Sequence, residues 1–337
     1  MDVLKFGFRY WKRNLGFSVI TQIMSFTALG ADLLLPMLTA LFIDYIIKDS
    51  PVKNDNVFSF LLDGSWGQVH TMELFWHLAV VFLGLLFLKL ILVYSKNVIN
   101  QRLGLNLETD LRLATFHKLM ELDSATISEY NTGELLTTVN SDTIMFKEMF
   151  CRIIPNILDS AFVLVIAIIL LASINAWLLM IPVLMIPVFA FALMRFKKLA
   201  RLNFRNIRSC NSDMNLKVQE NIEAVRLVRS FTNEEKELEK FNEANQNLRD
   251  SYIKQVKLSA SFEAAFSAIK QFAYIGSIAV SAILVMNGQI RVGYLASCAA
   301  YILKIMDYIT MINNMMFQMQ QQIVSGYKMM PFMECES

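Results

Sequence analysis

The chain has 337 residues, of which 55% are apolar and 18% charged, and its formal net charge is +2. So high an apolar content excludes an ordinary soluble domain and a disordered chain, and predicts an all-α polytopic membrane protein. The sequence lacks the sustained alternation of apolar and polar residues that is typical of a membrane β-barrel, so a barrel is not expected. The four cysteines, at positions 151, 210, 298 and 335, lack metal-ligand spacing. We therefore expect free thiols and no metal site.

Residues 1–14 alternate aromatic and basic side chains, as in Phe8-Arg9-Tyr10-Trp11-Lys12. Such a segment can form an interfacial helix, with its rings at the membrane boundary and its cations toward phosphates. It can equally be a plain basic flank that sets topology. Both interpretations place the N-terminus in the cytoplasm.

Six apolar blocks are each long enough to cross a bilayer, which takes about 20 helical residues. The predicted spans are residues 15–47, 72–94, 153–173, 177–194, 264–286 and 292–319. Turn residues separate the third from the fourth span at 174–176, and the fifth from the sixth at Asn287-Gly288-Gln289.

Two long charged excursions, residues 95–152 and 195–263, follow the second and the fourth span without an intervening breaker. The part of the second excursion from 195 to 257 carries fourteen Lys/Arg and nine Asp/Glu but no Gly or Pro, and keeps apolar residues at helical spacing. External segments hold only Lys48, Lys53 and Arg291 as basic residues. The positive-inside rule therefore predicts a cytoplasmic location for both excursions and both termini.

Long helical arms that leave the lipid need a partner at their tips, and the two tips carry distinct motifs. The first reads FHKLMEL at 116–122, YNTGELL at 130–136 and NSD at 140–142. The second reads ENIEAVRLVRSF at 220–231, with Glu234 and Phe241 beyond it. Gly133 is expected to let the chain reverse in a conformation that is costly for other residues.

These motifs resemble the two intracellular loops of ATP-binding cassette (ABC) exporters, and the resemblance covers essentially the whole chain. Gly288, Gly293 and Tyr301 are similar to the family's connection between the fifth and sixth spans. One departure is Ala224, where the family usually has Gly. The resemblance implies one transmembrane domain over residues 15–333, preceded by an interfacial elbow helix at 1–14. It also implies a multi-pass protein of the cell membrane.

By the same resemblance, each tip bears a coupling helix that contacts a nucleotide-binding domain. The positions implied are Ser124, Ala125, Thr126, Ile127, Ser128, Glu129, Tyr130, Gly133, Asn221, Ile222, Glu223, Ala224, Val225 and Arg226. Two six-span halves would pair, as a homodimer or a heterodimer, with spans four and five crossing to the other half. ATP and Mg would bind the partner nucleotide-binding domain.

The chain itself has no Gly-Lys pair of a phosphate-binding loop and no Leu-Ser-Gly-Gly-Gln-like stretch. We therefore expect no catalytic residue and no cofactor here, and a nucleotide-binding domain absent from this chain. The ATPase is then either a separate polypeptide or the remainder of a longer half-transporter, and the sequence favours the second arrangement.

Several charged residues fall inside the predicted spans, where charge is costly and usually faces the bundle interior or a wet cavity. They are Asp32, Lys89, Asp159, Lys270, Lys304 and Asp307. We hypothesise that these six residues form a polar tier and are candidates for a substrate pathway. In this tier Asp32 would pair with Lys89, and Lys270, Lys304 and Asp307 would line the pathway. The alternative is that all of them are structural pairs or snorkel to the inner interface.

Two other functions remain open on the sequence: a secondary transporter, and a non-transporting scaffold or receptor with cytoplasmic arms. A secondary transporter usually shows inverted repeats and broken helices, which are not evident. No cluster has catalytic spacing, and nothing in the sequence points to nucleic acid. The transported substrate is left undefined, because it depends on the shape of a cavity.

Overall fold

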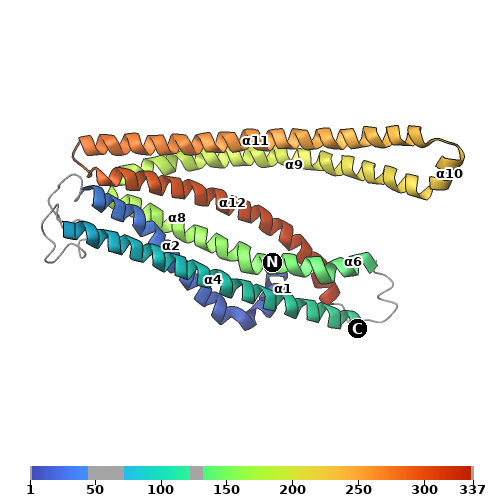
Figure 1. The fold of residues 1–337 in the computed structure, drawn as a ribbon, viewed down its shortest axis with the longest axis horizontal. Helices are drawn as coiled ribbons and strands as arrows, with labels where there is room; N and C mark the ends of the chain where they lie inside the picture. Colours follow the sequence, from blue (N-terminus) through green and yellow to red (C-terminus); the bar gives the residue numbers. More distant parts are fainter. Residues whose placement is uncertain (1, 45–71, 122–131, 335–337) are drawn as a thin grey trace. The chain divides into compact units, whose positions relative to one another are not determined.

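A computed structural model describes residues 2–44, 72–121 and 132–334, and within these ranges the chain contains helices and turns but no strand (Figure 1). The all-α prediction is thus confirmed. The chain divides into two compact units. Unit 1 comprises Met1–Leu179 and Ser277–Ser337, and unit 2 comprises Met180–Gly276. Each unit is described by itself.

Unit 1 begins with a short helix, α1 (Asp2–Trp11), and a single 3-10 turn, η1 (Lys12–Asn14). The long apolar helix α2 (Leu15–Phe42) follows directly. Pro36 lies inside α2. A proline there removes one backbone donor and leaves the carbonyl four residues earlier without its helical partner.

The helix α4 (Met72–Glu121) is 50 residues long and runs unbroken across the predicted end of the second span at residue 94. At about 1.5 Å per residue it is roughly 75 Å long, more than twice the thickness of a hydrocarbon core. The predicted continuity of the span with its charged extension is therefore confirmed.

Five helical segments follow one another without a gap from residue 132 to residue 174. They are α6 (Thr132–Thr137), η3 (Thr138–Asp142), α7 (Thr143–Glu148), η4 (Met149–Ile153) and α8 (Ile154–Ile174). The segments η3 and η4 are π-helical turns, and both contact α4 and α12. Such turns arise from packing, and the sequence pattern predicted only a plain helix here.

Two predicted turns are confirmed. Asn175 is extended (φ −165°, ψ 130°) between α8 and the 3-10 turn η5 (Ala176–Leu179). Gly288 has φ +71° in the turn that follows Met286, a left-handed conformation that favours glycine. The last helix, α12 (Gly293–Glu334), starts just beyond this turn.

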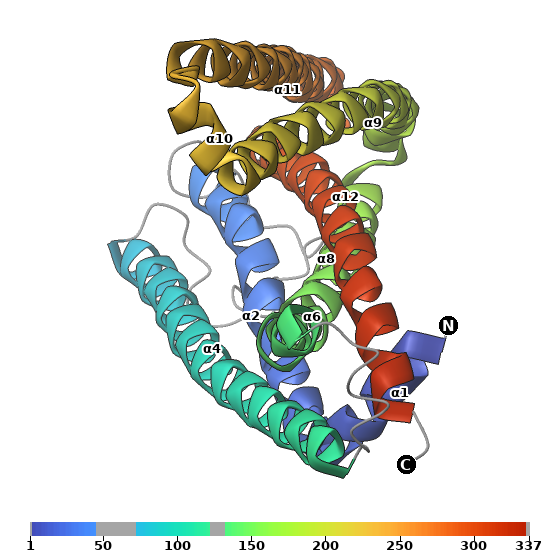
Figure 2. The same cartoon turned by 90° about the vertical axis from the view of Figure 1, so that its right-hand side faces the viewer.

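Helices α2, α4, α8 and α12 pack together in unit 1 (Figures 1 and 2). One buried cluster joins α1, α4, the segment 146–151 and the end of α12, and it consists of Trp11, Leu103, Leu107, Leu111, Phe146, Met149, Phe150, Cys151 and Met329. A second cluster joins α2 and α4 through Met37, Leu38, Leu41 and Leu78.

Unit 2 is a helical hairpin of α9 (Met180–Glu223), the short α10 (Val225–Ser230) and most of α11 (Glu234–Met286). The two long helices run side by side, with α10 at the far end (Figure 1). Six helices in the described part of the chain are long and apolar enough to cross a membrane. The predicted number of spans is confirmed, and the protein is a multi-pass membrane protein.

Candidate functional site

Asp32 of α2 is the centre of a charged cluster within the apolar part of unit 1. Lys89 of α4 and Lys304 of α12 each form an ion pair with its carboxylate. Asp32 and Lys89 thus pair as the sequence suggested. Lys304, expected beside the pathway, also contacts Asp32 directly. Three helices are therefore joined at one carboxylate, which we call the upper cluster.

The proline of α2 explains why Lys304 also reaches the backbone. Pro36 has no N–H, so the carbonyl of Asp32 has no donor at the usual helical position. The Nζ atom of Lys304 donates to that carbonyl oxygen at 3.2 Å. The proline thereby leaves an acceptor without its helical donor, and α12 supplies one.

Two further hydrogen bonds join α12 to α2, and a third joins α12 to Asp44, just beyond the end of α2. The Tyr301 hydroxyl donates to the Leu33 carbonyl at 2.8 Å, and the Ser297 hydroxyl donates to the Pro36 carbonyl at 2.5 Å. The Gly293 N–H donates to Asp44 Oδ1 at 2.7 Å. A Cβ at residue 293 would overlap the Ala40 carbonyl, so only glycine allows this approach. The three donors recur every four residues along one face of α12.

Asp159 of α8 is the centre of a second cluster, which we call the lower cluster. Its carboxylate accepts from Lys96 Nζ at 2.9 Å, Ser25 Oγ at 2.7 Å and Gln22 Nε2 at 2.6 Å. Asp159 is 5% exposed and Ser25 is 2% exposed. The carboxylate is saturated with donors, as a buried charge requires.

Sequence reasoning missed Lys96, because it was assigned to the charged extension beyond the second span. A signal was present in its spacing from Lys89. Lys89 and Lys96 are seven residues apart on α4, and Ser25 and Asp32 are seven residues apart on α2. Residues at this interval share one helical face, so the antiparallel pair brings both lysines to α2.

The other two charges predicted inside the spans lie elsewhere. Asp307 is an exposed residue of α12, one turn beyond Lys304. Lys270 is half-buried on α11 and belongs to unit 2, whereas the other five charges belong to unit 1. Among the described residues, no group of three or more His, Cys, Asp or Glu side chains is arranged to hold a metal ion.

Side chains bridge the two long helices of unit 2 at separate levels. Phe189 contacts Phe266 with ring centroids 4.8 Å apart, and Phe196 contacts Phe262 at 4.6 Å. Farther along, Cys210 Sγ lies 3.5 Å from Ser251 Oγ. The positions rise on α9 as they fall on α11, so the two helices are antiparallel.

The predicted second coupling segment lies at the end of this hairpin. Asn221, Ile222 and Glu223 end α9, and Val225 and Arg226 begin α10. No residue of α10 is buried. Four large apolar side chains are exposed here, and they are Ile222 (68%), Val225 (44%), Leu227 (61%) and Phe231 (70%).

The hairpin end keeps a defined shape despite its exposure. Ala224 sits between α9 and α10, and its carbonyl accepts from the Val228 N–H at 3.0 Å. Thr232 has φ 48°, a left-handed conformation that is uncommon outside glycine. On α11, a hydrogen bond from Lys240 lowers the pKa of Glu237. The exposed apolar residues are thus carried on a defined turn.

The first predicted coupling segment is only partly described. Residues 124–130 lie outside the described residues, and Gly133 is the second residue of α6. The expectation that Gly133 permits a chain reversal is wrong, because its backbone is helical. A glycine is tolerated in the first turn of a helix, where its N–H has no intrahelical partner.

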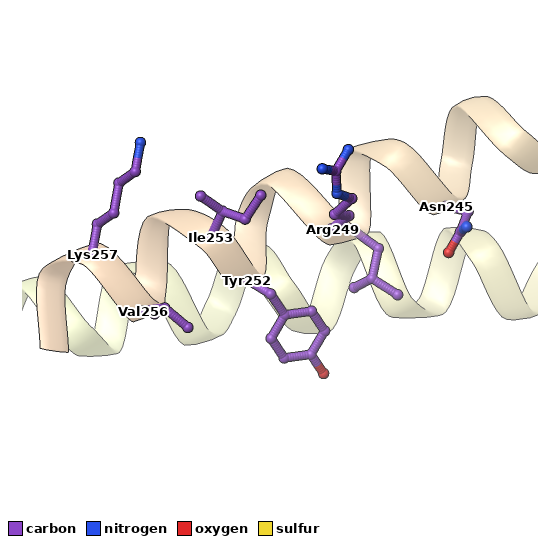
Figure 3. Close-up of a pocket in the computed structure, with 7 residues that line it drawn as sticks. Asn245, Arg249, Tyr252, Ile253, Val256 and Lys257 are labelled. Atoms are coloured by element: carbon purple, nitrogen blue, oxygen red, sulfur yellow. The ribbon is translucent and has the colours of Figure 1, made fainter. Parts of the chain in front are cut away.

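An apolar strip runs along α11 within unit 2 (Figure 3). Leu248, Tyr252, Ile253 and Val256 line a shallow hollow together with Asn245, Arg249 and Lys257. Tyr252 and Val256 are exposed. The strip lies in the segment predicted to stand outside the lipid.

The geometry is that of a multi-pass membrane protein with helices that extend far beyond a bilayer's thickness. Residues 19–308 match the family described as the ABC transporter transmembrane region, and the chain belongs to this family.

Relatives extend this comparison. The chain is 22% identical to a putative multidrug export ATP-binding/permease protein, YgaD, of Bacillus subtilis over 96% of this chain and 53% of that protein. It is 22% identical to an ATP-dependent lipid A-core flippase of Desulfotalea psychrophila over 76% of this chain and 45% of that protein. The uncharacterized ABC transporter ATP-binding protein YknV of Bacillus subtilis is 24% identical over 72% of this chain and 41% of its own length. The chain spans about half the length of the curated relatives it matches.

Proposed function

We propose that this chain forms the transmembrane domain of an ATP-driven exporter and couples ATP hydrolysis by a nucleotide-binding domain to alternating access. The observation that carries the proposal is the exposed apolar end of the α9–α11 hairpin, in a chain that belongs to the ABC transmembrane family. The relatives' names describe ATP-binding proteins. ATP and Mg therefore belong, in this proposal, to a domain outside these 337 residues, on the same or another polypeptide.

The proposed orientation places both termini, α10 and the segment 122–131 in the cytoplasm, with the spans in the cell membrane. The distribution of basic residues supports it, since the connections predicted to be external hold only Lys48, Lys53 and Arg291. In this orientation α1 lies at the cytoplasmic headgroup layer. The turn at Gly288 faces the exterior.

Coupling would occur where the hairpin end enters a groove of the nucleotide-binding domain. Ile222, Leu227 and Phe231 offer apolar side chains that gain from burial, and Arg226 and Glu223 flank them with charge. The remaining predicted residues, 124–130 and Gly133, would supply the equivalent contact from the first excursion. A rigid-body movement of the partner would then act on α9 and α11 along their length.

The upper cluster is the proposed polar part of the substrate pathway, with Asp307 one turn away. Its side chains keep 21–34% exposure, so solvent or cargo can reach them. Asp159 is proposed to be structural, because its cluster is saturated and buried. Lys270 remains a proposed pathway residue of unit 2. An amphipathic cargo fits a pathway that is apolar with few charges, and the relatives named for multidrug export and lipid A-core flipping support it.

A second six-span half is the proposed partner, and its contact would include the arms that extend beyond the lipid. The apolar strip of α11 around Tyr252 and Val256 supports this, since exposed apolar area on a long arm gains from being covered. The two halves together would form the pathway, which one half cannot enclose.

The proposal is tested in the ATP-hydrolysing assembly, with the chain joined to or co-produced with its nucleotide-binding domain. Ile222→Ala and Phe231→Ala should lower transport-coupled ATPase activity at least about tenfold, because each removes apolar contact of roughly 1.5–3 kcal/mol. Leu216→Ala, at an exposed apolar residue (51%) seven positions before Glu223, is the matched control. Equal activity of all three variants would contradict the coupling role.

A further inference from the structure

The N-terminal helix α1 has two opposite faces, and one of them packs tightly on the protein. Trp11 is 5% exposed, and its ring centroid lies 5.9 Å from that of Phe150. Gly7, one turn earlier, approaches so closely that a Cβ there would overlap the rings of Phe146 and Phe150. This contact fixes the rotation of α1 about its own axis, so its outward face is defined.

The outward face of α1 is cationic and aromatic. Lys5, Phe8 and Arg9 on α1 and Lys12 in the following turn are all exposed. At about 100° per residue they gather on the side of the helix opposite Gly7 and Trp11. Across residues 1–14 the sequence has four basic residues and one acidic residue, Asp2.

The connection to α2 places this face at the edge of the lipid. Only the three-residue turn η1 separates α1 from α2, a helix long and apolar enough to cross the membrane. The exposed apolar residues of α2 begin at Phe17 and recur at Ile20 and Ile23. The cationic face therefore stands about one helical turn from the start of a lipid-facing stripe, where headgroups lie.

We propose that the outward face of α1, formed by Lys5, Phe8, Arg9 and Lys12, binds anionic lipid headgroups in preference to zwitterionic ones. This inference rests on the proposed placement of α1 at the membrane and goes beyond it by naming the headgroup charge. Phosphate-bearing anionic lipids complement three cations, whereas the Phe8 ring enters the interface whatever the headgroup. Each cation contributes about fivefold to the local preference for anionic lipid.

The test measures which lipids the chain retains. The protein is reconstituted in phosphatidylcholine nanodiscs containing a minority of phosphatidylglycerol, extracted in mild detergent, and its retained lipids are quantified by mass spectrometry. We expect phosphatidylglycerol enrichment that falls at least about 100-fold in the triple variant Lys5→Glu, Arg9→Glu, Lys12→Glu, since three cations at about fivefold each are lost. The matched control carries the same charge change on exposed α11 residues, as Lys236→Glu, Arg249→Glu and Lys254→Glu, and should keep the enrichment.

A second pair of variants distinguishes the effect of the cations on lipid preference from the effect of the Phe8 ring on membrane contact. Phe8→Ser should lower the retention of both lipids while leaving their ratio unchanged. Lys5→Gln with Lys12→Gln removes two cations without introducing repulsion and should lower the ratio about 25-fold. Enrichment that persists in the charge variants, or that disappears equally in the α11 control, would overturn the proposal. Because no nucleotide is present, failure of the exporter proposal leaves this outcome unaffected.

Discussion

The two antiparallel helix pairs of this protein, α2 with α4 and α9 with α11, differ in the contacts that join them. In the first pair, ion pairs and hydrogen bonds add to an apolar cluster. Asp32–Lys89 and the Lys96–Ser25 hydrogen bond of 2.6 Å cross the first pair. Widely spaced contacts of aromatic rings cross the second. Ion pairs in an apolar bundle fix one register, since a shifted helix would leave charge unpaired. Ring contacts tolerate small shifts, which suits a hairpin proposed to transmit movement.

The largest effect should come from breaking the lower cluster. Asp159→Leu leaves the half-buried Lys96 without its carboxylate, and we expect the free energy of unfolding to fall by about 3 kcal/mol. The measurement is denaturant-induced unfolding in micelles. Asp159→Leu combined with Lys96→Met removes both charges and should recover most of the loss. No recovery in the double variant would show that the ion pair is not the source of the loss.

A smaller effect is expected in the hairpin of unit 2. Phe189 is 2% exposed on α9, so Phe189→Ala should cost about 3 kcal/mol and speed amide exchange along α9 and α11. Phe191→Ala removes an exposed ring two positions away and is the matched control. Exchange that accelerates equally in unit 1 would contradict the separate behaviour of the two helix pairs.

The approach of α12 to α2 can be tested at its closest point. Gly293→Ala places a Cβ against the Ala40 carbonyl and the Asp44 carboxylate, and overpacking of this kind costs about 1–3 kcal/mol. Gly84→Ala on α4 meets no atom within 4 Å and should be neutral or slightly stabilising. Thermal unfolding of both variants in one detergent is the measurement. Equal midpoints would argue against a tight contact.

The smallest effect concerns Glu108, in the α4 segment predicted to lie outside the membrane. A hydrogen bond from Lys147 at 2.8 Å lowers the pKa of this carboxylate, and Arg112 also donates to it. A lowered folded-state pKa means that the stabilisation is present above the unfolded pKa of about 4.3 and is lost as pH falls through the folded value.

The thermal unfolding midpoint should be higher at neutral pH than at about pH 3, and Glu108→Gln should reduce this difference. Glu121→Gln, at an exposed position of the same helix, should leave that difference unchanged. An unaltered pH profile in Glu108→Gln would contradict the assigned ion pair.

Much of the fold was predictable because hydropathy and charge position act over long segments. Six apolar blocks predicted six spanning helices, and the absence of Gly and Pro from residues 195–257 predicted that α9 and α11 extend far beyond their spans. The turns at Asn175 and Gly288 followed from local turn chemistry. The π-turns η3 and η4 were not predictable, because they arise where α4 and α12 press on one helix, a tertiary effect that leaves no local pattern.

The site was predictable only in part. Charged side chains are costly in lipid, and this argument pointed to Asp32, Lys89 and Asp159. The structure places the first two in the upper cluster and Asp159 in the lower cluster. Lys96 was missed because the predicted second span ended at residue 94, two residues before it. Gly133 was predicted to reverse the direction of the chain because glycine favours turns. Helices also accept glycine near their ends, and Gly133 lies in the first turn of α6. The Lys304 contact with the Asp32 carbonyl uses the acceptor that Pro36 leaves, and it depends on the packing of α12 against α2.

One labelling experiment tests the central claim that the end of the α9–α11 hairpin meets a cytoplasmic partner. Single cysteines at Ser230, next to the exposed Phe231, and at Gln289, beside the turn residue Gly288, are introduced after replacing the four native cysteines. A membrane-impermeant maleimide is then applied to intact cells. The account predicts labelling of Gln289→Cys in intact cells and of Ser230→Cys only after permeabilisation. Labelling of Ser230→Cys from outside intact cells would contradict the account.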